Sequence, residues 1–351
     1  MNEPGESRES RVEGRPAASA GGRAAASHPS LLGSRQHLSP NQRAWRRFGR
    51  NRPAIVSAWF LTALVVFVIA WPLCLKVASY AGTKGAVFAQ THDPDQLSDL
   101  QFQPPSGQHW FGTDVHGRDL FSRVLHGAQI SMLVGVVGAG VSLVIGVLWG
   151  SIAGYAGGRT DGLMMRFVDI LYSLPSIIFV IVLVTTLEGL LKQWLAAIGS
   201  DMLGRFARLL FLFVGLGAVS WLTMARIVRG QVLSLRAQAF VEVSRALGAG
   251  PVRILLRDIL PNIFGVVIIY LTLTVPAIIL YESFLSYLGL GVQPPMASWG
   301  SLIAEGVEQM NPIRSYWWLI VFPGGALIST LLALNFLGDG LRDAWDVRGE
   351  G

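Results

Sequence analysis

The chain has 351 residues, of which 52% are hydrophobic and only 14% are charged, and its mean hydropathy is +0.48. Soluble domains carry about 25% charged residues, so the composition excludes an ordinary soluble protein and indicates several membrane spans. The net charge of +6 does not point to nucleic-acid binding, because the arginines are spread over many loops and form no single basic stripe.

The N-terminal part divides into three predicted segments. Residues 1–40 are rich in Ser, Arg, Ala and Gly without apolar periodicity, so we expect a disordered cytoplasmic tail. Residues 41–75 combine the basic collar RAWRRFGRNR with a first transmembrane helix. This helix is too long for the apolar part of a cleaved signal peptide, which is therefore not expected. Residues 76–126 are then a periplasmic or extracellular segment.

Uncharged runs predict an all-α, polytopic membrane protein with six transmembrane helices. The runs are 53–75, 127–158, 170–187, 209–225, 259–281 and 315–338. The five helices after the first form a core at 127–340, followed by a cytoplasmic tail at 341–351. With both termini inside, 20 of the 28 Lys and Arg residues fall on the inner side, and this excess marks the cytoplasm.

The outer segment contains the sequence GTDVHGRD, whose Asp114, His116 and Asp119 resemble metal ligands. Loops for hard cations usually carry more oxygen ligands at regular spacing, so a turn with Asx and ion-pair bonds is favoured, and no metal site is expected. Tryptophans that flank the spans on the outer side are expected to form an interfacial belt. They are Trp110, Trp299, Trp317 and Trp318.

Glycines and prolines occur at notable positions within the predicted spans. Gly146, Gly150 and Gly154 lie at i, i+4 and i+8 in the second span, a spacing that lets two helices pack closely in lipid. Prolines are expected to interrupt spans three, five and six, as beside a water-filled cavity, although purely structural bundles also contain kinked helices. They are Pro175, Pro276 and Pro323.

Two carboxylates lie at or near membrane depth, where a charge is costly and suggests a function. Asp169 opens span three, near the predicted cytoplasmic boundary, where solvation or pairing with Arg166 is favoured. Glu282 lies within span five or at its outer end. Both are candidates for a pathway through the membrane, and for Glu282 a hydrogen bond to a neighbouring helix is the equal alternative.

The stretch FVEVSRALGAGPVRILLRDILPN, 240–262, is polar compared with its surroundings and lies in a predicted cytoplasmic loop, 236–262, between spans four and five. Its first half predicts a short helix with an apolar stripe at Phe240, Val243 and Leu247, which ends at Gly248. Its second half predicts another amphipathic helix, which Pro261 is expected to break. Such helices can lie on the inner leaflet or insert as a knob into a partner protein.

The order of residues in this stretch resembles the EAA loop of ABC-importer permeases. Glu242, Gly248, Leu260 and Pro261 stand at matching positions, whereas Val243 and Ser244 replace the two alanines and Asp258 replaces an isoleucine. The match is closer to the dipeptide/oligopeptide/nickel branch. FGTDVHGRDLFSRVLHGAQISM, MMRFVDILYSLPSIIFVIVL, ESFLSYLGLGVQPPMASWGSLI and LNFLGDGLRDAWD are similar to the second, C-type permease subunit of that branch.

The resemblance implies one half of a peptide translocation pathway in the bacterial plasma (inner) membrane, with 240–262 as the loop that couples it to ATPases. The implied partners are a second permease subunit, two ABC ATPase subunits and an extracytoplasmic substrate-binding protein. The implied coupling residues are Phe240, Glu242, Arg245, Leu247, Gly248, Arg253, Arg257 and Pro261. Nickel or another small solute is the alternative substrate within the branch.

No catalytic residue or cofactor is expected in this chain. All six histidines lie outside the predicted spans, so a hydrolase inside the membrane would have no base. None of Lys76, Lys84 and Lys192 precedes Ser or Thr, so no phosphate-binding loop exists and partners must hydrolyse ATP. The alternative from another class is a proton-coupled carrier that uses Asp169 and Glu282, although no inverted repeat is visible.

Overall fold

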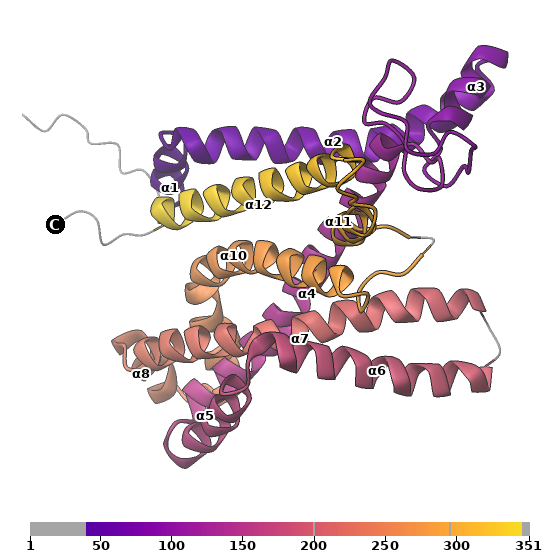
Figure 1. Ribbon diagram of the computed structural model, residues 1–351. Helices are drawn as coiled ribbons and strands as arrows, with labels where there is room; N and C mark the ends of the chain where they lie inside the picture. Colours follow the sequence, from indigo (N-terminus) through magenta and orange to yellow (C-terminus); the bar gives the residue numbers. More distant parts are fainter. Residues whose placement is uncertain (1–39, 199–200, 295, 346–351) are drawn as a thin grey trace, which may run out of the picture. The chain divides into compact units, whose positions relative to one another are not determined.

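The computed structural model describes residues 40–198, 201–294 and 296–345, and every regular element in these ranges is a helix (Figure 1). The helices are α1 (Pro40–Phe48), α2 (Arg52–Tyr80), α3 (Thr83–Thr91), α4 (Leu120–Ala156), α5 (Gly158–Tyr172), α6 (Ser176–Ile198), α7 (Asp201–Arg236), α8 (Ala239–Ala246), α9 (Pro251–Arg253), the π-helix η1 (Ile254–Ile259), α10 (Leu260–Tyr287), α11 (Trp299–Glu308) and α12 (Trp318–Trp345). The tail expected at 1–40 lies outside the described residues except for Pro40, with which α1 begins. Residues 346–351 of the expected C-terminal tail also lie outside them, whereas α12 continues to Trp345.

Four helical stretches in the described part are long and apolar enough to cross a membrane: α2, α4, the continuous stretch from α9 to α10, and α12. The pair α5 and α6 adds a fifth if it counts as one broken span, because its two helices are bent by 92° at the break that contains Pro175. The chain is therefore an all-helical polytopic membrane protein, as its composition predicts.

Of the three prolines expected to interrupt spans, only Pro175 separates two helices. Pro276 and Pro323 lie inside α10 and α12, so the interruptions expected there are wrong. A proline removes one backbone hydrogen bond, and neighbouring helices can still keep the surrounding helix intact. Both prolines are buried against such neighbours. Pro175 is exposed instead, and the residue before a proline avoids the helical conformation.

The helix α4 begins before the uncharged run that predicts it. The Asp119 carboxylate caps it by accepting the Ser122 N–H at 3.0 Å. Arg123 lies in the first turn, and its charge is neutralised by Asp114 and Glu305 at 2.7 and 2.6 Å. The segment 76–126, expected to lie outside the membrane, contains the end of α2, all of α3 and the start of α4.

At the centre of the bundle, α4 contacts α2, α5, α7, α10, α11 and α12. Its three spaced glycines lie where it crosses α7. A Cβ atom on Gly146 would lie 2.6 Å from the Cβ of Met224, and one on Gly154 would lie 2.9 Å from the Cβ of Val232. The absence of side chains at these positions lets the two backbones approach each other.

Contacts between helix ends show which segments share one side of the membrane. The rings of Trp45 and Trp345 are 5.9 Å apart, so α1 lies beside the end of α12. Trp345 in turn lies against Gly265 near the start of α10. The loop 236–262 leads directly into that start, so it lies on the same side as α1, the side predicted to be cytoplasmic.

Candidate functional site

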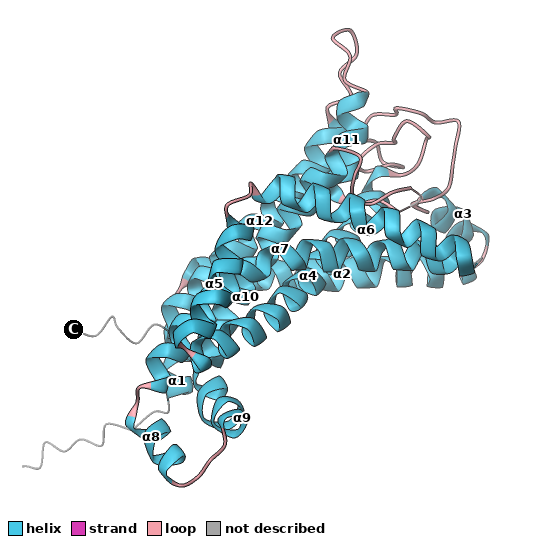
Figure 2. Ribbon diagram, turned by 90° about the horizontal axis from the view of Figure 1, so that it is seen from below, coloured by secondary structure: helices cyan, strands magenta, loops and turns pink. Residues whose placement is uncertain are grey.

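The loop 236–262 presents apolar side chains to its surroundings. Its helices α8 and α9–η1 form a hairpin whose turn contains Gly248 (Figure 2). Val241, Ile254 and Ile259 point inward and are buried in a cluster with α7 and α10. The exposed apolar face consists of Phe240, Val243, Leu247, Val252 and Leu256. Contiguous exposed apolar surface on an ordered element is typical of a protein interaction site.

Gly248 ends α8 as the sequence predicts, and the backbone explains why a glycine stands there. Its φ is +82°, a conformation that other residues adopt at a cost. The N–H of Ala249 donates to the carbonyl of Ser244 and that of Gly248 to Arg245, both at 3.0 Å, which is the Schellman ending of a helix. A Cβ at Gly248 would meet nothing within 4 Å, so the constraint is conformational and not steric.

The second helix of the hairpin does not end at Pro261, and that expectation is wrong. α9, η1 and α10 form one continuous helix from Pro251 to Tyr287. Pro261 occupies the first turn of α10, directly after the π-helix Ile254–Ile259. A first-turn position tolerates proline, and the wider π-turns before it absorb the change in hydrogen bonding.

The same loop carries exposed charged side chains next in sequence to the exposed apolar ones. Glu242, Arg245, Arg253 and Arg257 are all exposed, and none has an ion-pair partner among the described residues. Exposed, unpaired charges close to an apolar surface favour recognition of a partner with complementary charges.

Two ion pairs attach α5 to α7. Asp161 receives two hydrogen bonds from the guanidinium of Arg229, one of them at 2.7 Å. Asp169 pairs with Arg226, 57 positions away, at 2.7 Å and not with Arg166, and its side chain stays 59% exposed, so the solvation considered as the other alternative is also present. The guanidinium of Arg226 also lies 4.1 Å from the centre of the Tyr172 ring.

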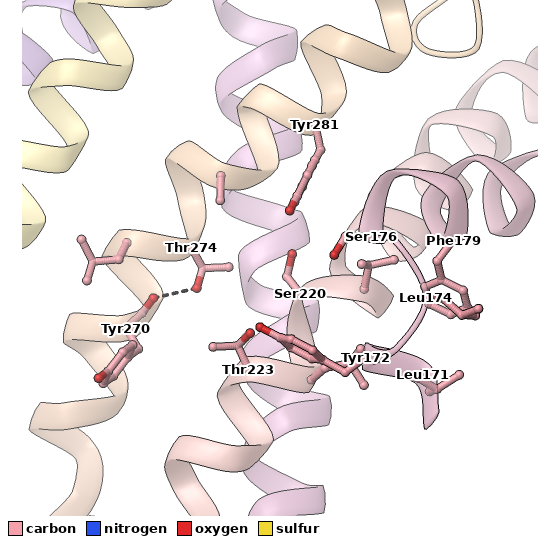
Figure 3. Close-up of a pocket in the computed structure, with 14 residues that line it drawn as sticks. Leu171, Tyr172, Leu174, Ser176, Phe179, Ser220, Thr223, Tyr270, Thr274 and Tyr281 are labelled. Atoms are coloured by element: carbon pink, nitrogen blue, oxygen red, sulfur yellow. Dashed lines mark hydrogen bonds between the residues drawn. The ribbon is translucent and has the colours of Figure 1, made fainter. Parts of the chain in front are cut away.

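A cavity of about 290 Å³ lies between the α5–α6 break, α7 and α10 (Figure 3). Its polar lining consists of hydroxyl groups: Tyr172, Ser176, Ser220, Thr223, Tyr270, Thr274 and Tyr281. Its apolar lining is Leu171, Leu174, Phe179, Val219, Leu222, Leu273 and Ala277. Neither of the two pathway candidates, Asp169 and Glu282, is among the lining residues.

Sequence reasoning missed this cavity, although α10 carried a usable signal. Tyr270, Thr274, Ala277 and Tyr281 recur at i, i+4, i+7 and i+11, which places them on one face of the helix. A face of hydroxyl and small side chains on an otherwise apolar span indicates a surface turned away from lipid. The partner segments on α5, α6 and α7 offered no comparable pattern.

Glu282 is completely buried and lies in a network of hydroxyl groups. Its two carboxylate oxygens accept hydrogen bonds from Ser286 at 2.6 Å and from Ser131 on α4 at 3.1 Å. Ser131 in turn accepts the N–H of Trp299, the first residue of α11, and Ser286 accepts the N–H of Val292. The hydrogen bond to a neighbouring helix, one of the two alternatives considered for Glu282, is therefore present in the structure.

Both serine hydroxyls donate to Glu282, one to each carboxyl oxygen. Each serine oxygen also accepts a backbone N–H, so the network joins Glu282 to the start of α11 and to Val292. The start of α11 supplies a partial positive charge in place of a cationic side chain.

The outer GTDVHGRD segment forms a turn held by hydrogen bonds and ion pairs, the alternative that the sequence favours. Asp114 accepts the N–H groups of His116 and Arg118 at 2.8 and 2.9 Å, and it also pairs with the side chains of Arg118 and Arg123. Asp119 caps α4 and pairs with His109 at 2.9 Å. Among the described residues, no three His, Cys, Asp or Glu side chains are placed to hold a metal.

Two of the four tryptophans expected in an interfacial belt belong to the core instead. Trp299 is completely buried and donates to the carbonyl of Val124, and Trp318 is buried and donates to that of Thr113. Trp110 and Trp317 are about half exposed. An indole ring buries much apolar area once its N–H has a partner, and sequence alone does not reveal that partner.

The fold and these sites define a class: a multi-pass membrane protein with a broken helix, a polar cavity beside it and a loop with exposed apolar side chains on one side. Residues 146–348 match the family described as "Binding-protein-dependent transport system inner membrane component", and residues 39–105 match the "N-terminal TM domain of oligopeptide transport permease C". The first match covers more than half of the chain, so the chain belongs to this family of transport permeases. It is an inner-membrane transport component and not an enzyme, as the sequence predicts.

Relatives in several bacteria extend over nearly the whole chain. The oligopeptide transport system permease protein OppC of Haemophilus influenzae is 43% identical over 307 residues, which are 87% of this chain and 88% of the relative. OppC of Escherichia coli K12 is 44% identical over 305 residues, 87% and 90% of the two chains. The dipeptide transport system permease protein DppC of Bacillus subtilis is 40% identical over 312 residues, 89% and 87%. The resemblance to a C-type permease of this branch is therefore confirmed.

Proposed function

We propose that this chain is a permease subunit of an ATP-driven importer for dipeptides or oligopeptides. Its relatives of about 40% identity are named for these two substrates, and they match it along most of their length. The other components of such an importer are a second permease subunit, two ATPases and an extracytoplasmic binding protein. The two ATPase subunits hydrolyse the ATP.

The coupling to the ATPases is assigned to the loop 236–262. The observation that supports this is the exposed apolar face of α8 and α9–η1, in which Leu247 is 82% exposed and Val252 is 67% exposed. A face of this kind on the predicted cytoplasmic side suits insertion into a groove of a partner protein. The exposed charges of Glu242, Arg245, Arg253 and Arg257 lie on the same loop, and Gly248 and Pro261 set its backbone.

We also propose that the chain crosses the membrane six times. The helix α7 has 36 residues and contains the uncharged run 209–225, so we count it as a sixth span beside the four long stretches and the α5–α6 pair. An even number places the start of α2 and the end of α12 on one side, which agrees with the contact between Trp45 and Trp345.

The Leu247→Asp variant tests the coupling assignment. Burying a leucine side chain contributes about 2 kcal/mol, so we expect at least a tenfold lower recovery of the ATPases with the purified complex. Transport-linked ATP hydrolysis should fall in parallel, while the amount of folded chain in the membrane stays unchanged because Leu247 is exposed.

The matched control is Leu97→Asp, the same change at a leucine that is 65% exposed in the outer segment. It should retain the ATPases. The double variant Glu242→Ala with Gly248→Pro should lose them, because proline cannot adopt a φ of +82°. Full recovery of ATPases with Leu247→Asp, or uptake that follows the proton gradient without ATP, would overturn the assignment.

A further inference from the structure

We propose that the cavity between the α5–α6 break, α7 and α10 contacts the peptide during passage and binds its backbone through uncharged hydroxyl groups. The cavity would therefore be indifferent to the charge of the peptide's side chains. This inference rests on the proposed function, in which the transported solute is a peptide.

The first support is that most hydroxyl groups in the cavity have no hydrogen-bond partner among the described residues. The Thr274 hydroxyl donates to the carbonyl of Tyr270 at 2.7 Å, and that of Ser220 lies 3.4 Å from the carbonyl of Leu216. The hydroxyl groups of the other five polar lining residues have no hydrogen-bond partner in the described part of the chain. These residues are Tyr172, Ser176, Thr223, Tyr270 and Tyr281.

These free groups suit a peptide backbone. A hydroxyl both donates and accepts, so it can pair with either the N–H or the carbonyl of an amide. Figure 3 shows the side chains of Tyr281, Ser220 and Thr223 coming from two different helices toward the same space. Hydroxyl groups with rotatable protons adapt to successive amides, so they can contact a chain that moves past them.

The second support is the electrostatics of the lining, which contains no charged side chain among the residues that the structure describes. Three charged side chains lie close to lining residues. Arg226 and Asp169 neutralise each other beside Tyr172, at one end of the lining. Glu282 follows the lining residue Tyr281 in sequence, but its carboxylate is turned to Ser131 and Ser286 and is completely buried.

A neutral lining matters because charges interact strongly in such surroundings. Two unit charges at 4 Å interact by about 4 kcal/mol at an effective dielectric constant of 20. One fixed charge in the wall would therefore trap peptides of one sign and repel those of the other. With none present, the wall contacts only what all peptides share.

The size and chemistry of the cavity narrow the ligand class further. Its volume of about 290 Å³ is near the lower limit of roughly 300 Å³ for ligand pockets, so it holds one part of a peptide at a time. Transition metals such as nickel prefer imidazole and thiolate ligands, and none of the described residues that line the cavity is a His, Cys, Asp or Glu. The lining therefore fits peptide amides better than the nickel ion considered from the sequence.

The test introduces a charge into the wall and compares it with an uncharged change of the same size. Ala277 lines the cavity and is exposed, so it can accept a larger side chain. The variants Ala277→Asp and Ala277→Asn are made in the complete transporter, reconstituted with its binding protein and ATPases. ATP-dependent uptake is then measured at saturation for the tripeptides Ala-Glu-Ala, Ala-Gln-Ala and Ala-Lys-Ala.

Each rate is divided by the wild-type rate for the same peptide, which cancels the preference of the binding protein. We expect Ala277→Asp to favour Ala-Lys-Ala over Ala-Glu-Ala by about tenfold, and Ala277→Asn to treat all three peptides alike. Equal ratios for the three peptides in Ala277→Asp, with ATP hydrolysis intact, would overturn the inference and leave the proposed function in place. If the wild-type transporter takes up none of the peptides, the proposed function itself fails.

Discussion

The Gly150→Leu variant should lose the packing of α4 against α7 and, with it, the folded transporter. A Cβ at this position would lie against the carbonyl oxygen of Ala225 and 2.9 Å from the Cβ of Val228. The first neighbour is backbone and cannot rotate away, so the two helices must separate. Overpacking costs about 1–3 kcal/mol where side chains can move, and we expect at least the upper value here. Size-exclusion profiles and thermal unfolding in detergent would measure the loss.

The control for this variant lies on the same helix. Gly140 has nothing within 4 Å of the position of a Cβ, so Gly140→Leu should be tolerated. Gly140→Ala should even stabilise α4, by up to about 1 kcal/mol, because glycine is a poor helix former. If Gly150→Leu and Gly140→Leu gave the same yield and melting temperature, close contact at Gly150 would not be important for the fold.

Replacing Glu282 with alanine should destabilise the outer half of the bundle by about 4 kcal/mol. The hydroxyl groups of Ser131 and Ser286 would both lose their acceptor, and each buried donor without a partner costs about 1–3 kcal/mol. The truncated side chain also leaves a void. Because Ser131 holds the first N–H of α11, we expect a lower melting temperature together with easier proteolysis of the loop between α10 and α11.

The Glu282→Gln variant separates charge from shape. Its amide oxygen can replace one carboxylate oxygen, whereas its NH₂ group meets a hydroxyl that already donates, so its effect should be smaller than that of alanine and still clear. Glu308→Gln, at an exposed glutamate near the end of α11, is the matched control and should leave the melting temperature unchanged. A Glu282→Gln protein as stable as wild type would show that neither the charge nor the second acceptor oxygen of Glu282 stabilises the fold.

Several features of the candidate sites and of the helix packing could be predicted from local sequence. The order of residues in 240–262 predicted a loop with two helical segments and a glycine turn, and both are present. The three spaced glycines of the second span lie against another helix. These features depend on residues a few positions apart, and their chemistry restricts the backbone whatever surrounds it.

The expectations that the structure contradicts share a different cause. Pro276 and Pro323 were expected to interrupt spans and Pro261 to break a helix, yet the helices continue because buried neighbours or a π-turn compensate for the lost hydrogen bond. Trp299 and Trp318 were expected at an interface, yet they are buried because distant carbonyl groups accept their N–H groups. Intrinsic preferences of single residues were overridden by contacts that their local sequence does not contain.

By itself, the sequence determined that this is a helical membrane protein, roughly where its long apolar helices lie and which loop leaves the membrane, because hydropathy and helical periodicity act within one turn or one span. Only the tertiary structure decided which groups meet. It paired Asp169 with Arg226, surrounded Glu282 with hydroxyl groups from separate segments and assembled an uncharged cavity from three helical regions. These arrangements depend on how α4, α7 and α10 pack, and packing energies come from pairs of residues far apart in the chain.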